Sequence, residues 1–151
     1  MADLNNADLE TLLGYSFNEP ELMDMAISLR ERGKEPRPKK KKDRGLATLG
    51  EAVMGCVVVN HFYSQGMNSE KINEERSARV CRENHARIAE EIGLSRYLMP
   101  ANGSAKSGRP AVNALGQSLE EIMGAIYLDD INAGGTGIGA CWEVLRKINM
   151  I

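Results

Sequence analysis

The stretch RGLATLGEAVMGCVVVNHFY, which runs from Arg44 to Tyr63, decides the fold of this chain. Residues 46–63 are apolar around most of the circumference of a helix, and the segment is too long for an ordinary strand. They therefore predict a central helix that other elements cover on several sides. Steps of three and four residues place four positions on one face: Ala47, Glu51, Met54 and Val58. Glu51 is thus a carboxylate on a helix that must pack tightly.

Helical periodicity continues on both sides of this stretch, and no convincing pair of strands interrupts it. Expected N-caps are Asn18, followed by Pro20 in the first turn, and Ser69. The expected helices are a first one ending at Leu13 before Gly14, one over 18–30, the central one, a long one over 69–93 that bends near 81–84, one over 111–130, and a last one around Trp142 and Leu145. The sequence predicts an all-α helical bundle.

Size and composition predict a single soluble domain over residues 1–151. No apolar run is expected to reach the roughly 18 residues that a membrane span needs, and the acidic N-terminus does not resemble a signal peptide. Cys56, Cys81 and Cys141 stand singly, which favours reduced thiols over disulfides or a zinc site. We therefore expect a cytoplasmic protein without membrane contacts.

An excess of positive charge is concentrated in one segment of the chain. Residues 30–44 carry a net charge of +6, which leaves −8 for the remainder. Pro36 and Pro38 break any helix here, so a solvated loop is expected to carry four consecutive lysines: Lys39, Lys40, Lys41 and Lys42. Two interpretations stay open: the loop only improves solubility, or its lysines attract a polyanion in a salt-dependent way.

The candidates for chemistry are acidic. No zinc-binding or nucleophile motif is present, and His61 and His85 are isolated on expected helices. Glu51 and Glu120, in contrast, interrupt apolar helices, where an ionised carboxylate needs a partner. One interpretation is a salt bridge to an arginine of the intervening helix, with four candidates: Arg76, Arg79, Arg82 and Arg87. The other is a Mg²⁺ site, because Mg²⁺ prefers one or two carboxylates with waters and phosphates.

Four segments, in order and covering nearly the whole chain, resemble the endonuclease domain of the ribonuclease III family. LETLLGYSFNEPELMDMAIS (9–28) is similar to the entry segment of the family, and LGEAVMGCVV (49–58) resembles its signature LGDAVL. SEKINEERSARVCRENHARIAEEIGLSRYL (69–98) resembles a pattern that contains LVS-N-E-x-LA-x-IA. KSGRP (106–110) and LEEIMGAIYLDD (119–130) are similar to the segment that ends in EALIGAIYLD. The resemblance implies an all-helical fold, a homodimer formed through residues 46–63, and Mg²⁺-dependent cleavage of double-stranded RNA.

The four acidic positions of the family fall on Ala47, Glu51, Gln117 and Glu120. Only Glu120 matches as it stands; Glu51 is one methylene longer than the family residue, Gln117 is a neutral amide, and Ala47 is a degenerate position. The compact Mini-III branch is similar in lacking the first and third acids. The resemblance therefore implies Glu51 and Glu120 as catalytic residues and as ligands of a weakly bound Mg²⁺ or Mn²⁺, with Gln117 acting through a water.

Two further departures bear on partners. Thr48 stands where the family usually has an aromatic residue that packs into the other subunit. No double-stranded RNA-binding domain is expected after the nuclease fold, so the expected RNA contacts are lysines of this chain: Lys39, Lys40, Lys41, Lys42 and Lys106. The leading hypothesis is a metal-dependent endonuclease of double-stranded RNA in RNA processing. The alternative is a catalytically inactive subunit that binds RNA or dimerises, and a helical interaction module without an RNA role is third.

Overall fold

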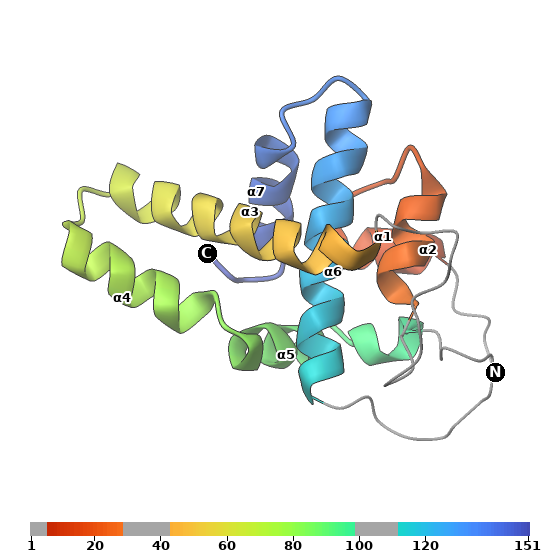
Figure 1. The fold of residues 1–151 in the computed structure, drawn as a ribbon, viewed down its shortest axis with the longest axis horizontal. Coiled ribbons are helices and arrows are strands. Elements are labelled where there is room, and N and C mark those ends of the chain that lie inside the picture. The colour runs from red at the N-terminus through yellow and green to blue at the C-terminus, as the bar shows by residue number, and fades with distance from the viewer. Residues whose placement is uncertain (1–5, 29–42, 99–111) are drawn as a thin grey trace.

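The computed structural model describes residues 6–28, 43–98 and 112–151, and it is all-helical over these ranges (Figure 1). The elements in chain order are α1 (Asn6–Leu13), α2 (Pro20–Ile27), α3 (Asp43–Ser64), α4 (Ser69–Arg79), α5 (Arg82–Glu91), the 3₁₀ helix η1 (Leu94–Tyr97), α6 (Val112–Asn132) and α7 (Ile138–Lys147). The described residues form no β-strand, which confirms the predicted all-α class.

Helices α3 and α6 cross at the centre of the molecule, and the other helices pack around them (Figure 1). Two glycines allow the crossing. A Cβ on Gly50 would lie 1.7 Å from the carbonyl oxygen of Glu120, and a Cβ on Gly124 would lie 2.3 Å from that of Leu46. Any side chain at either position would collide with backbone, so the glycines set the separation of the two helices.

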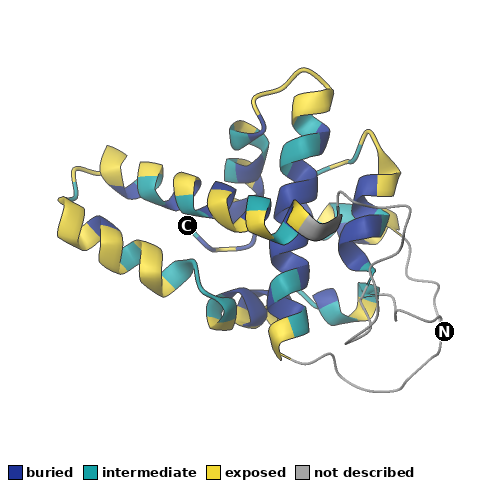
Figure 2. Cartoon of the chain, viewed as in Figure 1, coloured by how far each residue is buried: buried dark blue, intermediate teal, exposed yellow. Residues whose placement is uncertain are grey.

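Burial follows this arrangement (Figure 2). On α3 the buried positions are Leu46, Gly50, Val53, Met54, Val57, Val58 and Phe62, spaced by one, three and four residues. Glu51 is exposed, although its spacing puts it on the same side of the helix as buried Met54 and Val58. Each residue advances the helix by about 100°. Glu51 directly follows Gly50, which contacts α6, so its side chain lies beside the row of buried positions rather than within it.

The helix starts differ from two predictions. Asn68, rather than Ser69, is the N-cap of α4, and its side chain accepts a hydrogen bond from the backbone of Lys71. The N-cap residue of α2 is Glu19, not Asn18. The predicted bend near Cys81 is a full break, because extended backbone at Cys81 separates α4 from α5. The basic segment 30–44 overlaps α3, which begins at Asp43, and otherwise lies outside the described residues.

Asn18 is not free to cap α2 because it binds Asp129 of α6. The buried carboxylate of Asp129 accepts hydrogen bonds from the Tyr15 hydroxyl at 2.6 Å and from the backbone amides of Asn18 and Glu19 at 2.9 and 2.7 Å. Burial by itself would raise the pKa of Asp129, but these hydrogen bonds outweigh it and lower the pKa below its usual value. A carboxylate on α6 thus fixes the turn between α1 and α2.

The central helix also bears on the expectation about membranes. Residues 45–64 are long and apolar enough to cross a membrane by length and composition, so the expectation that no segment reaches this limit was wrong. This is weak evidence for a span, because the core helix of a globular domain passes the same test. Here α3 packs against α6, α4 and α7.

Candidate active site at the crossing of α3 and α6

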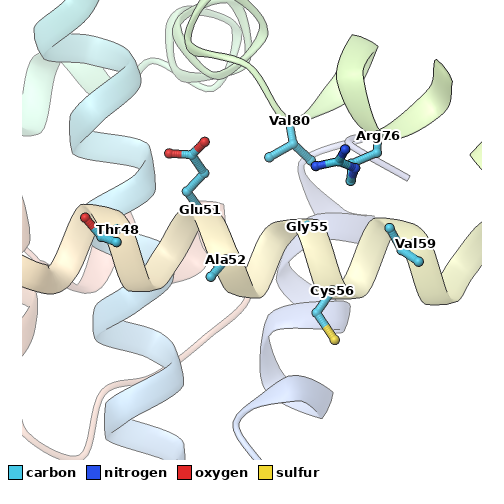
Figure 3. Close-up of a pocket in the computed structure, with 8 residues that line it drawn as sticks. All are labelled: Thr48, Glu51, Ala52, Gly55, Cys56, Val59, Arg76 and Val80. Atoms are coloured by element: carbon cyan, nitrogen blue, oxygen red, sulfur yellow. The ribbon is translucent and has the colours of Figure 1, made fainter. Parts of the chain in front are cut away.

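The crossing brings the two predicted acidic positions to the same place. Gly50, which precedes Glu51 on α3, lies against the backbone of Glu120 on α6. The side chain of Glu51 lines an open groove of about 590 Å³ (Figure 3). The groove runs along α3 and has Arg76 and Val80 on its other side. Glu51 is therefore a solvent-accessible carboxylate beside the crossing.

Glu120 has different surroundings, because it is buried and both of its oxygens accept hydrogen bonds. Arg82 Nε donates to Glu120 Oε2 at 3.0 Å, and Arg82 Nη2 donates to Oε1 at 3.1 Å. His85 Nδ1 donates to Oε2 at 2.8 Å, since the carboxylate can only accept. The side chain of His85 is fully buried. Helix α5 thus places a guanidinium and an imidazole on the one carboxylate that matches the family pattern.

The electrostatics of Glu120 follow from these contacts. Burial alone would raise its pKa, but the hydrogen bonds from His85 and Arg82 and the charge of Arg82 together lower the pKa below its usual value. Glu120 is therefore an ionised carboxylate whose charge Arg82 already balances. A salt bridge to an arginine of the intervening region was one of the two interpretations of this residue, and the structure contains that salt bridge.

A further contact holds Arg82 in place. A Cβ on Gly116 of α6 would lie 2.4 Å from Arg82 Cδ and 2.8 Å from the Arg82 carbonyl oxygen. Gly116 and Glu120 are one helical turn apart on the same face of α6. The stem of Arg82 thus lies in a slot at Gly116, and its guanidinium reaches Glu120 from there.

The remaining positions add few donors for a divalent ion. Ala47 offers no ligand, and the Gln117 amide donates a hydrogen bond to Glu121 at 3.0 Å. Within residues 6–28, 43–98 and 112–151, no three His, Cys, Asp or Glu side chains gather as a metal site requires. With both Glu120 oxygens bonded to α5, the arranged side chains do not fit Mg²⁺ or Mn²⁺, and the predicted roles of Glu51, Glu120 and Gln117 stay predictions.

The lysines predicted to contact RNA cannot be placed relative to this centre. All five fall outside the residues that the structure describes: Lys39, Lys40, Lys41, Lys42 and Lys106. Their predicted contacts with RNA therefore stay predictions, which rest on the charge of the sequence alone.

The two histidines have different roles. His61 packs edge-on against Phe62 and Trp142, with ring centroids 4.8 and 5.5 Å apart, which is a packing role. His85 is the residue that sequence reasoning missed, because no local spacing links it to Glu120. A signal was present, however: where LVS-N-E-x-LA-x-IA has asparagine and leucine, this chain has Arg82 and His85.

Comparisons with known proteins agree with the fold and with the motif segments. The Ribonuclease III domain family matches residues 44–130, which is more than half of the chain. Ribonuclease 3 of Fusobacterium nucleatum is 32% identical over 129 residues, covering 83% of this chain and 55% of that protein. Ribonuclease 3 of Syntrophobacter fumaroxidans is 32% identical over 145 residues, covering 93% and 57%. The chain spans about half the length of these curated relatives.

Solved structures give the same result. Two structures of the nuclease domain of ribonuclease III from Campylobacter jejuni superpose on this chain with TM-scores of 0.75 and 0.74, at 25% and 26% identity. Each superposition covers 96% of this chain, and 96% and 94% of the respective neighbour. With the motif segments, the helical architecture and these matches in agreement, the chain belongs to the ribonuclease III domain family.

Proposed function

We propose that this chain acts on double-stranded RNA as a ribonuclease III endonuclease domain in RNA processing, with Glu51 and Glu120 as its acidic pair. The observation that carries the proposal is the backbone contact at Gly50, which brings the two acidic positions of α3 and α6 together. The family generally depends on divalent metal ions. Weakly bound Mg²⁺ or Mn²⁺ at this pair is the finer expectation from the sequence; it would require Arg82 to move from Glu120, and the experiment below tests it. A cytoplasmic location remains an expectation from the sequence.

Charge supports RNA as the partner. The segment 30–44 carries +6 in a chain whose remainder carries −8, so a polyanion is attracted to one part of the molecule. Contacts of lysines with phosphates recognise the shape of a duplex rather than its sequence. We expect five lysines to make such contacts: Lys39, Lys40, Lys41, Lys42 and Lys106.

We also propose a homodimer formed through residues 46–63. A solved relative, the nuclease domain from Campylobacter jejuni, is described as having flexibility in a region involved in dimer formation. In this chain the groove along α3 is lined by small residues, including Ala52, Gly55 and Cys56, to which a second helix could approach closely. Thr48 lines the same groove in place of the expected aromatic residue, so the proposed contact has little aromatic surface.

A second candidate function is RNA binding or dimerisation without cleavage. Specific observations favour it: Ala47 and Gln117 are not acids, and Glu120 is engaged by Arg82 and His85. A site with one accessible carboxylate attracts a divalent ion weakly, because Coulomb attraction falls with each lost charge.

One experiment separates the candidates. The purified chain is incubated with duplex RNA in Mg²⁺ or Mn²⁺, beside Glu51→Gln and Glu120→Gln, and both binding and cleavage are measured. Glu91→Gln is the matched control, because Glu91 is an exposed carboxylate that pairs with Arg87 on α5. Cleavage that both site variants abolish and the control retains supports the endonuclease.

Binding without cleavage supports the second candidate. If binding depends on the lysine run 39–42, changing these four residues to alanine weakens it and flattens its salt dependence. A chain that binds no duplex RNA at any salt concentration contradicts both candidates and leaves a helical interaction module.

A further inference from the structure

We infer that the Arg82 side chain, with His85 behind it, occupies the cation position of Glu120 and closes this half of the acidic pair to divalent ions. The inference rests on the proposed function only in taking Glu120 as one of the two site acids. It assigns to α5 a built-in cationic cover, made of protein atoms, on the carboxylate that the family pattern would give to a metal.

Three hydrogen bonds occupy most of the acceptor sites of the Glu120 carboxylate. Arg82 donates from Nε to Glu120 Oε2 at 3.0 Å and from Nη2 to Oε1 at 3.1 Å. His85 Nδ1 donates a second hydrogen bond to Oε2 at 2.8 Å. A planar guanidinium matches a carboxylate in this two-point manner better than any other side chain. A divalent ion competes with Arg82 for the oxygen lone pairs and is repelled by its charge, so binding to Glu120 is favoured where Arg82 has moved away.

The exposed fractions of these side chains also indicate that Arg82 hinders the approach of an ion to Glu120. The side chain of Glu120 is 2% exposed, whereas that of Arg82 is 39% exposed. Arg82 therefore lies between the carboxylate and solvent, and His85, which is 0% exposed, lies on the inner side. An ion that approaches from solvent meets the positive guanidinium before it meets the carboxylate.

Packing at Gly116 and the position of Arg82 in α5 also restrain this arginine. Its stem fills the space that Gly116 leaves open, where a Cβ would lie 2.4 Å from Arg82 Cδ. Its backbone is fixed as well, because Arg82 is the first residue of α5 and that helix packs along α6. An arginine restrained at both its backbone and its stem gives up little additional freedom when it binds Glu120.

The expected effect on metal affinity follows from the ion pair. An opposite charge at this distance commonly stabilises a carboxylate by the equivalent of about one to three pKa units. A competing metal ion must replace this stabilisation, so Arg82 lowers the affinity of Glu120 for a divalent ion by roughly ten- to a thousandfold.

The test measures Mn²⁺ binding directly, from the loss of the electron paramagnetic resonance signal of free Mn²⁺. We compare the full wild-type chain with Arg82→Asn and with the matched control Arg87→Asn, which also removes one positive charge from α5 but from an exposed pair with Glu91. We expect weak binding to the wild type and the control, and at least about tenfold tighter binding to Arg82→Asn. Adding Glu120→Gln to Arg82→Asn should abolish the gain. Equal binding to wild type and Arg82→Asn overturns the inference.

Removing Arg82 leaves a buried carboxylate with one partner, so this variant can be less stable. The variant Arg82→Gln serves as a second version, because its amide can still donate one hydrogen bond to Glu120 without the positive charge. Mn²⁺ should raise the melting temperature of either variant by about 5 °C while leaving the wild type unchanged. If neither variant folds, the wild type decides: Mn²⁺ affinity that Glu120→Gln leaves unchanged supports the inference, and affinity that it lowers overturns it.

Failure of the inference and failure of the proposed function give different results. RNA binding that is absent from the wild type contradicts the proposed function and leaves the Mn²⁺ comparison interpretable. Duplex RNA cleavage by the wild type that requires Glu120, together with equal Mn²⁺ binding by Arg82→Asn, supports the function and overturns the inference.

Discussion

Substituting Gly50 with alanine tests the contact on which the fold and the candidate site both depend. The added Cβ would lie 1.7 Å from the Glu120 carbonyl oxygen, 2.7 Å from its carbonyl carbon and 2.9 Å from the Gly124 nitrogen. Close carbon–oxygen contacts in proteins are about 3.3 Å or longer. The two helices must therefore separate locally by about 1.5 Å, because all three neighbours are backbone atoms that cannot rotate away.

The expected cost follows from this separation. Overpacking a core usually costs about 1–3 kcal/mol, and here the contact is rigid on both sides, so we expect Gly50→Ala to lower the free energy of unfolding by about 3–5 kcal/mol. For a chain of this size that corresponds to a fall in melting temperature of about 10 °C. The measurement is thermal and urea unfolding followed by circular dichroism.

Gly45→Ala is the matched control on the same helix, since nothing lies within 4 Å of a Cβ at Gly45. Alanine is the better helix former, so this variant should be unchanged or up to about 1 kcal/mol more stable. A Gly50→Ala variant that unfolds within about 1 kcal/mol of the wild type would refute the close crossing, and with it the placement of Glu51 beside Glu120.

Other predictions concern the groups that surround the core. Asp129→Asn removes the charge that accepts the Tyr15, Asn18 and Glu19 hydrogen bonds, and we expect a loss of about 3 kcal/mol in urea unfolding. Because the pKa of Asp129 is lowered in the folded state, its contribution to stability is present above the unfolded pKa of about 4 and is lost as the pH falls toward the folded value. The acid limb of a stability–pH curve should therefore be shallower in Asp129→Asn; identical limbs would contradict this role. Burial raises the pKa of the Cys141 thiol to about 12, so Ellman's reagent should label exposed Cys56 in the native state and Cys141 only after unfolding; native labelling of Cys141 would show that its surroundings are open. Gly116→Ala should push Arg82 off Glu120, so that the variant gains Mn²⁺ affinity as Arg82→Asn does, and unchanged affinity would mean that the slot does not hold the arginine.

Much of this protein could be predicted from its sequence. The apolar stretch 46–63 predicted the central helix, and the place of Pro20 in the first turn of α2, the end of α1 before Gly14 and the last helix around Trp142 were confirmed. The same reasoning placed one acid on α3 and one on α6. These features depend on periodicity and on local backbone preferences, which the order of residues along the chain contains.

Only the tertiary structure decided what each acid does. Glu51 and Glu120 look alike in sequence, since each stands in an apolar helix, yet one is exposed in a groove and the other is buried under Arg82 and His85. His85 lies 35 residues from Glu120 in the chain, so no spacing rule connects them. Whether a carboxylate meets solvent or a cation depends on which helix packs across it. That choice is made by long-range contacts, here the backbone contacts at Gly50, Gly116 and Gly124, where the absence of a side chain allows the helices to come together.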